Sequence, residues 1–355
     1  MRKNLFKLFI LIPFIGLAQI PAGYYNSAQG LTGSNLKIAL HNIIKNHTQI
    51  SYANLWTAFP KSDKKTNGKV WDIYSDVPSG TPPYEFTFVT NQCGNYSVEG
   101  DCYNREHSWP QSWFNQLSGP VSDMFHIYPT DGKVNGIRSD YPYGKVATPT
   151  YTSLNGSRLG PCSNLGYGLT VFEPIDEYKG DLARGYFYMC TRYYSEDAGW
   201  STSDATNKAS LLPWQANVLL QWHHQDPVSA KEIARNDSIY YRFQHNRNPF
   251  IDNPQWADSI WHQDVTVFVK EFEFANSFSV YPNPSTDHFY VINHNNQNKL
   301  ETTIKVISIT GEVIEEQHLS FSESVSINCS HWGRGVYFIS VSTSEANSNF
   351  KFIKQ

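Results

Sequence analysis

The sequence predicts an α+β protein in two parts, a mixed helix and strand domain followed by a small, sandwich-like all-β domain. Three observations support this prediction. Between residues 19 and 275, helical apolar spacings alternate with strand-like patterns. From residue 276 onward the pattern is strand-like, with turns that contain Gly and Pro. With 355 residues, of which 40% are hydrophobic and 15% aromatic, the chain can fill both cores.

The first 18 residues predict a signal peptide. Arg2, Lys3 and Lys7 precede an apolar run over Leu8–Leu17, which ends in the small-residue cleavage pattern Gly-Leu-Ala. A membrane span needs about 20 apolar residues, and no run in the sequence reaches that length. We therefore expect an exported protein without a stable membrane span.

Four helices and one strand are expected in the first domain. Apolar residues at a spacing of three to four predict a helix after an N-cap at Ser34 and a second one over residues 182–193. A Pro at the start of residues 213–225 and a Ser-x-x-Glu capping box at residues 229–232 predict two more. Alternating apolar residues predict a strand over Tyr84–Val89.

The second domain is expected to consist of strands joined by tight turns. Pro282 and Pro284 mark its start, and Thr310-Gly311 predicts a hairpin turn. Gly335 predicts a turn before the last strong strand. About 80 residues of this pattern suit a small β-sandwich.

Five cysteines fit an oxidising compartment. Cys93, Cys102 and Cys162 lie in polar or Gly-rich sequence, which predicts at least one disulfide but leaves the pairing open, also with respect to Cys329. Cys190 lies within a helical apolar pattern and is expected to be a buried thiol. The absence of a C-x-x-C motif argues against a structural zinc site.

Two polar clusters, at residues 101–110 and 122–142, carry the chemistry of the first domain. Hydrolysis of a phosphodiester requires a base for water, a cation at the phosphate and oxygen ligands for that cation. Glu106, His107 and Asn135 supply these parts. Adjacent residues of an extended strand point to opposite faces, so the Glu-His pair alone does not establish a site.

Four sequence blocks resemble the secreted endonuclease I family. They are Asn104–Pro110, Pro129–Gly144, Val171–Arg184 and Asn246–Asp252, and the resemblance covers roughly residues 30–262. Members of this family are built around a ββα-metal (His-Me finger) core and cleave DNA and RNA with little sequence preference. The resemblance therefore implies a metal-dependent endonuclease.

The same resemblance assigns roles to residues of this chain. It implies that His107 is the general base, and that Glu106 and Asn135 hold one divalent cation. Oxygen ligands favour Mg²⁺, with Ca²⁺ or Mn²⁺ as alternatives. The implied product carries a 5′-phosphate.

The arginine that holds the scissile phosphate is not evident from the sequence. Smaller periplasmic members of the family carry it in an insertion between the His and Asn blocks, but no Arg lies between His107 and Asn135 here. Arg138 and Arg184 are the candidates. Arg105 is expected to be either scaffold or a substrate contact.

Several of these residues have equally good structural explanations. Arg184 could instead form an ion pair with Asp181 or Glu173. His126 could orient a metal ligand or fill a polar core position. Asp131 could act behind the site or cap a turn.

The net charge of the chain is −4, with 28 Lys+Arg and 32 Asp+Glu. A protein that binds nucleic acid usually carries a basic surplus. The sequence therefore predicts a local basic cleft, around Arg105, Lys133, Arg138 and Arg184, on an otherwise acidic surface.

The C-terminal domain resembles the type IX secretion sorting domain. The resemblance lies in Phe278–Ser285, Ile304–Ile314 and Gly333–Val341. It implies that the secretion machinery is a partner and that the protein is secreted or held at the outer-membrane surface. An adhesive β module is the alternative.

The resulting hypothesis is a secreted, monomeric endonuclease acting on DNA and RNA. The alternatives are a catalytically weak module that binds extracellular nucleic acid or polysaccharide, and a phosphodiesterase acting on another extracellular phosphate ester.

Overall fold

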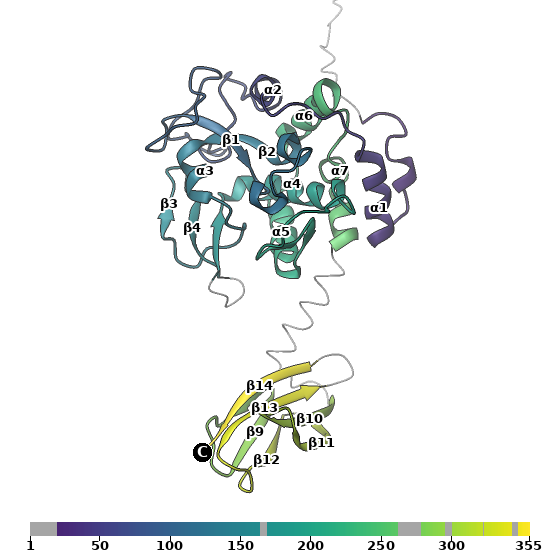
Figure 1. Ribbon diagram of the computed structural model, residues 1–355, viewed down its shortest axis with the longest axis vertical. Helices are drawn as coiled ribbons and strands as arrows, with labels where there is room; N and C mark the ends of the chain where they lie inside the picture. Colours follow the sequence, from purple (N-terminus) through teal and green to yellow (C-terminus); the bar gives the residue numbers. More distant parts are fainter. Residues whose placement is uncertain (1–19, 164–168, 262–277, 295–299, 322, 343–346) are drawn as a thin grey trace, which may run out of the picture. The chain divides into compact units, whose positions relative to one another are not determined.

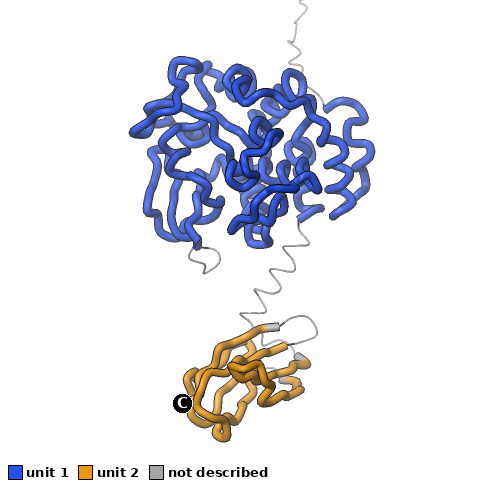
Figure 2. Tube along the Cα trace, in the orientation of Figure 1, with its two compact units in different colours: residues 1–262 blue, residues 263–355 orange. Residues whose placement is uncertain are grey.

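The computed structural model describes residues 20–163, 169–261, 278–294, 300–321, 323–342 and 347–355. The chain divides into two compact units, residues 1–262 and 263–355 (Figure 2). The first unit mixes helices with short strands, and the described part of the second consists of strands, which confirms the predicted α+β class. The expected signal peptide and the expected boundary between residues 275 and 276 lie outside the described residues.

The first unit contains helices of very different lengths and three small antiparallel sheets. The helices are α1 (Gly33–Ile44), α2 (Leu55–Ser62), α3 (Gly132–Arg138), α4 (Lys179–Arg192), α5 (Pro213–Gln225), α6 (Ala230–Ile239) and α7 (Pro249–Asp252). The sheets are β1 (Tyr103–His107) with β2 (Ile127–Asp131), then β3 (Tyr151–Thr152), β4 (Arg158–Pro161) and β5 (Thr170–Glu173), and finally β6 (Thr206–Asn207) with β7 (Ser210–Leu211). No helix among the described residues has both the length and the apolar character to cross a membrane.

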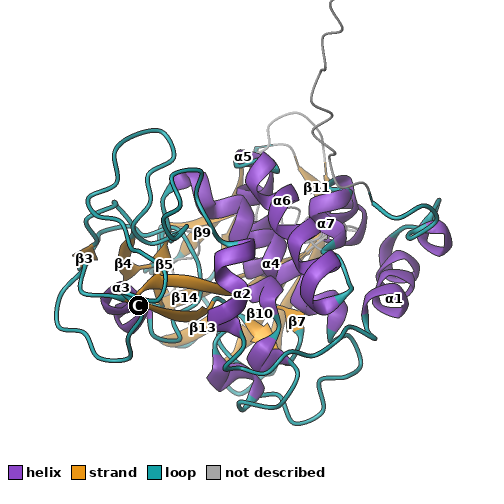
Figure 3. Ribbon diagram, turned by 90° about the horizontal axis from the view of Figure 1, so that it is seen from above, coloured by secondary structure: helices purple, strands orange, loops and turns teal. Residues whose placement is uncertain are grey.

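Helix α4 is the centre of the first unit (Figures 1 and 3). All of its residues are buried, and α1, α5 and α7 pack against it. Its position confirms the helix predicted over residues 182–193. Helix α5 has the predicted bounds, and the predicted capping box of α6 is present, with Ser229 Oγ accepting from the backbone N of Glu232.

Two predictions for the first unit are wrong. Helix α1 begins at Gly33, so the expected N-cap Ser34 lies inside its first turn. Residues 84–89 form no strand, although the chain there is paired at one point, where Phe86 O accepts a hydrogen bond from the backbone N of Val70 (2.9 Å). The alternating pattern reflects burial of one side of this segment, and no neighbouring strand completes a ladder.

Strands β1 and β2 form an antiparallel hairpin that leads directly into α3. The register pairs Tyr103 with Asp131 and His107 with Ile127. Asp131 also caps α3, because its Oδ1 accepts from the backbone N of Val134 (2.8 Å). This ββα unit brings the end of β1 against α3 and so positions the candidate site.

The second unit is a two-sheet sandwich. Its strands are β8 (Phe278–Tyr281), β9 (His288–Asn293), β10 (Leu300–Ser308), β11 (Val313–Phe321), β12 (Ser324–Asn328), β13 (Gly335–Ser342) and β14 (Asn347–Lys354). They form sheets with the orders β12-β9-β8 and β11-β10-β13-β14, and buried residues of both sheets share one core. The expected hairpin turn at Thr310-Gly311 is confirmed, because it joins β10 to β11. Gly335, expected in a turn before the last strand, is instead the first residue of β13, and β14 follows it.

Candidate active site

Glu106 and His107 lie next to each other on β1 and make contacts with different neighbours. Glu106 is 2% exposed, and its Oε1 accepts hydrogen bonds from Tyr74 Oη (2.8 Å) and Arg138 Nη1 (2.9 Å). Burial raises the pKa of Glu106, and the positive charge of Arg138 and the Tyr74 hydroxyl oppose that effect. The carboxylate is thus held rigidly against α3.

His107 is held in one tautomer by a backbone carbonyl. Its Nε2 lies 3.1 Å from Val121 O. Because a carbonyl can only accept, Nε2 carries the hydrogen, and Nδ1 of the neutral ring is the acceptor. Burial, followed by the charge that His126 can carry, lowers the pKa of His107 to about 3. The side chain is therefore a neutral imidazole at neutral pH.

His126 lies beside His107 and makes a hydrogen bond to the carbonyl of Pro120, the residue before Val121. The two ring centroids are 5.5 Å apart, and His126 Nε2 lies 2.6 Å from Pro120 O. The two histidine side chains therefore hydrogen-bond to the carbonyl oxygens of two consecutive residues, Pro120 and Val121. His126 Nδ1 is buried without a hydrogen-bond partner among the described residues. His126 is 0% exposed, which fits the polar core position that was one of its two expected roles, and a role in orienting a metal ligand stays a prediction.

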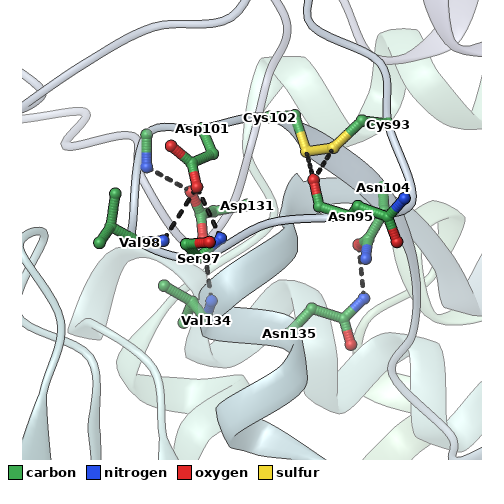
Figure 4. The surroundings of a disulfide bond; sticks show 11 residues. Cys93, Asn95, Ser97, Val98, Asp101, Cys102, Asn104, Asp131, Val134 and Asn135 are labelled. Carbon is green, nitrogen blue, oxygen red and sulfur yellow. Dashed lines mark hydrogen bonds between the residues drawn. A yellow bond between two sulfur atoms is a disulfide. The ribbon is translucent and has the colours of Figure 1, made fainter.

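Asn135 lies in the middle of α3 and forms an amide pair with β1. Its Nδ2 donates to Asn104 Oδ1 (2.7 Å), as Figure 4 shows. Both residues line a cleft of about 570 Å³. The lining residues are Tyr52, Trp56, Gln92, Cys93, Gly94, Asn104, Arg105, Gln111 and Asn135.

Arg105 is the cationic residue of this cleft lining. Its guanidinium carbon lies 3.6 Å from the ring centroid of Tyr52 and 4.6 Å from that of Trp56. Within the described part of the chain it makes one hydrogen bond, from Nη1 to Tyr52 O (2.9 Å). Most of its N–H groups therefore remain available to a ligand.

The geometry does not support Arg138 and Arg184 as phosphate contacts, and this corrects the expectation. Both side chains are 0% exposed. Arg138 donates to Glu106 and to the carbonyls of His107 (2.8 Å) and Ser108 (2.5 Å). Buried and bonded in this way, it supports the site from behind.

Arg184 is committed to a buried ion pair between helices. It donates two hydrogen bonds to the carboxylate of Glu232, of 2.5 and 2.8 Å, and lies 3.4 Å from Asp181. The expected partner Glu173 instead binds Arg158 and Lys179. Arg184 thus ties α4 to the capping box of α6.

A disulfide joins Cys93 to Cys102 (Figure 4), and Cys93 lines the cleft. It closes a loop that carries Tyr96, whose ring lies against α3 where the helix has glycines at positions 132 and 136. A Cβ at either glycine would overlap this ring, which explains the two glycines of the block. The other three cysteines are buried and free, as expected for Cys190.

The sequence did not reveal Tyr52, Trp56 and Tyr74 as parts of the site. They lie far before β1 in the chain, outside the recognised blocks. Asn104 begins one of these blocks, and its place two residues before Glu106 was the available signal. Asp131 caps α3, which is the structural explanation foreseen for it.

Comparison with known proteins shows two matches to family models. Residues 32–255 match the endonuclease I model, and residues 279–355 match a secretion system C-terminal sorting domain. The chain is 36% identical over 247 residues to an extracellular ribonuclease of Bacillus subtilis, with 67% of this chain and 78% of that protein covered. An extracellular ribonuclease of Bacillus amyloliquefaciens gives the same identity and coverage. A periplasmic deoxyribonuclease of Aeromonas hydrophila is 28% identical over 152 residues, covering 42% of this chain and 53% of that protein.

Proposed function

Because the chain belongs to the endonuclease I family and is a nuclease, we propose that it cleaves both DNA and RNA with little sequence preference, using one divalent cation. The observation that carries this proposal is His107, a neutral imidazole fixed in one tautomer, which lies one residue along β1 from the buried carboxylate of Glu106. The sorting domain directs the protein to type IX secretion. We further propose that the enzyme acts as a monomer and that its catalytic domain spans residues 19–275.

The donors at the site fit a hard cation. Glu106 offers a carboxylate and Asn135 an amide oxygen, and Mg²⁺ prefers oxygen ligands and retains several waters. The described residues contain no group of three or more His, Cys, Asp and Glu side chains suited to a softer metal. When bound, the cation would offset charge on the scissile phosphate and help the 3′ oxygen to leave.

His107 acts as the general base. Its Nδ1 takes a proton from the attacking water, while Nε2 keeps its hydrogen and donates it in a hydrogen bond to Val121 O. The water oxygen then bonds to phosphorus, the bond from phosphorus to the 3′ oxygen breaks, and the released 3′ oxygen takes up a proton from solvent water. The products carry a 5′-phosphate and a 3′-hydroxyl.

Arg105 holds the phosphate. It lines the cleft with Asn135, and its guanidinium retains free N–H groups, whereas Arg138 and Arg184 are buried and bonded. A planar guanidinium that lies over two aromatic rings is well suited to recognise a phosphate. The contacts with Tyr52 and Trp56 restrict its position.

The test is cleavage of plasmid DNA, single-stranded RNA and a small bis-aryl phosphate, with and without EDTA. We expect both polymers to be cut, EDTA to abolish cleavage, and His107→Ala to lose at least about 100-fold in rate, as expected for a missing general base. Cleavage of the small ester alone would identify a different phosphodiesterase. Binding of nucleic acid without cleavage would identify a binding module.

A further inference from the structure

Asn104 and Glu106 lie on the same face of β1, because side chains two residues apart in a strand point the same way. The register agrees, since Asn104 pairs with Thr130 and Glu106 with Tyr128 along β2. Helix α3 packs against this hairpin and presents Asn135 to Asn104. Asn104 is thus the neighbour of both proposed cation ligands.

The hydrogen bond between the two amides has a direction. Asn135 Nδ2 donates to Asn104 Oδ1 at 2.7 Å, so the nitrogen end of the Asn135 amide is committed to β1 (Figure 4). The oxygen end is the only part of that side chain that can bind a cation, because an amide NH₂ group is a donor. Among the residues that the structure describes, no hydrogen bond is made to this oxygen, so the observed orientation leaves it available to a ligand in the cleft.

An asparagine amide does not keep such an orientation by itself. The terminal torsion of Asn is broad and roughly two-fold, so a half-turn that exchanges oxygen and nitrogen meets little resistance unless a partner opposes it. A reversed amide would present its NH₂ group to the cation.

We propose that Asn104 is a positioning residue that holds the carbonyl oxygen of Asn135 toward the catalytic cation. This inference rests on the proposed function, in which Asn135 is a cation ligand. Partners of metal ligands commonly act in this way, and their loss costs roughly 10- to 100-fold in affinity or activity.

The test is calorimetric titration of the full chain with Mg²⁺ in the absence of nucleic acid. Asn104→Leu removes the acceptor at similar size and should weaken Mg²⁺ binding at least tenfold. Asn104→Asp can only accept, so it should retain or increase the affinity. Asn42→Leu is the matched control, because the amide of Asn42, on α1, accepts one exposed hydrogen bond, which comes from Lys45. It should bind Mg²⁺ like the wild type.

A purely structural role for Asn104 predicts a different result. In that case Asn104→Leu would lower the melting temperature and leave Mg²⁺ affinity unchanged, which overturns the inference. If Asn104→Leu does not fold, Asn104→Ala and Asn104→Asp provide the same comparison. Adding Asn104→Leu to Asn135→Ala should cause no further loss of affinity, and a further loss would also contradict the inference.

Failure of the proposed function would be visible separately. If Asn135→Ala binds Mg²⁺ as tightly as the wild type, the ligand assignment itself is wrong. If Asn135→Ala weakens binding but Asn104→Leu does not, the positioning role of Asn104 alone is wrong.

Discussion

The guanidinium of Arg138 lies beneath the candidate site and contacts three successive residues of the chain. It donates to the Glu106 carboxylate and to the carbonyls of His107 and Ser108. A single side chain therefore fixes the direction of the proposed ligand and the backbone of the proposed base. Its position in the sequence, at the end of a polar helix, gives no sign of this burial.

Replacing Arg138 should destabilise the protein strongly. In Arg138→Met the buried carboxylate of Glu106 loses its positive partner, which typically costs about 3–5 kcal/mol in the free energy of unfolding. Urea denaturation measures this loss. Arg158→Met is the control, because Arg158 is 40% exposed and its partner Glu173 retains Lys179, so a loss below about 1 kcal/mol is expected.

A different result would restore the original expectation for Arg138. If Arg138→Met kept the stability of the wild type and bound nucleic acid more weakly, its guanidinium would be a phosphate contact. Local sequence could not settle this question, because the depth at which a polar side chain is buried depends on elements far away in the chain. Tyr74, which donates to the same carboxylate of Glu106 as Arg138 does, lies 32 positions before Glu106.

At the scale of the element, helices could be predicted where the signal lies within their own local sequence. Helix α5 begins at a Pro and ends at the expected residue, and the capping box of α6 is local by nature. The strand expected over residues 84–89 required a partner strand, and periodicity gives no information about partners. The ββα core was implied by the family resemblance, and spacing alone would not have predicted it.

The contact between α3 and the disulfide loop gives a prediction about Gly136. A Cβ in Gly136→Ala would overlap the ring of Tyr96, so the substitution should cost about 1–3 kcal/mol in the free energy of unfolding. In a Tyr96→Ala background the overlap disappears. There Gly136→Ala should be neutral or stabilising by up to about 1 kcal/mol, because Ala favours helix over Gly.

Thermal and urea unfolding of the wild type, the two single variants and the double variant complete this double-mutant cycle. An equal loss in both backgrounds would show that Tyr96 is not the obstacle. Nuclease activity should be measured on the same variants, because α3 carries Asn135. A displaced helix should reduce nuclease activity in Gly136→Ala and recover it in the double variant.

At the scale of the whole molecule, the chain is acidic overall, and its positive charge at the candidate site is more local than the sequence suggested. The predicted basic cleft included Arg105, Lys133, Arg138 and Arg184. Among these, Arg105 belongs to the lining of the described cleft, whereas Arg138 and Arg184 are neutralised in buried ion pairs. Substrate binding should therefore depend on one arginine and the cation, and less on a broad positive surface.

The separation into two units predicts that the catalytic unit works alone. Each proposed site residue lies between Tyr52 and Arg138, and the two units have separate cores. A chain that ends at residue 275 should keep the kcat/KM of the full-length protein within about twofold, since the residues proposed to touch substrate are unchanged. Cleavage of single-stranded RNA measures this.

The matching control is His107→Ala in the shortened chain, which should be inactive. A shortened wild-type chain that folds, as circular dichroism would show, yet cleaves more than tenfold more slowly would contradict the division. Export is the expected loss in the shortened chain, because the sorting domain is absent.

The paired histidines have a consequence for how such a site can change during evolution. His107 and His126 make hydrogen bonds to the neighbouring carbonyls of Val121 and Pro120. The segment that contains these two residues therefore aligns the proposed base, His107. The exposed residues 115–118 before that segment bear no part of this alignment. We therefore expect insertions and deletions to be tolerated there, because they leave the proton acceptor in place.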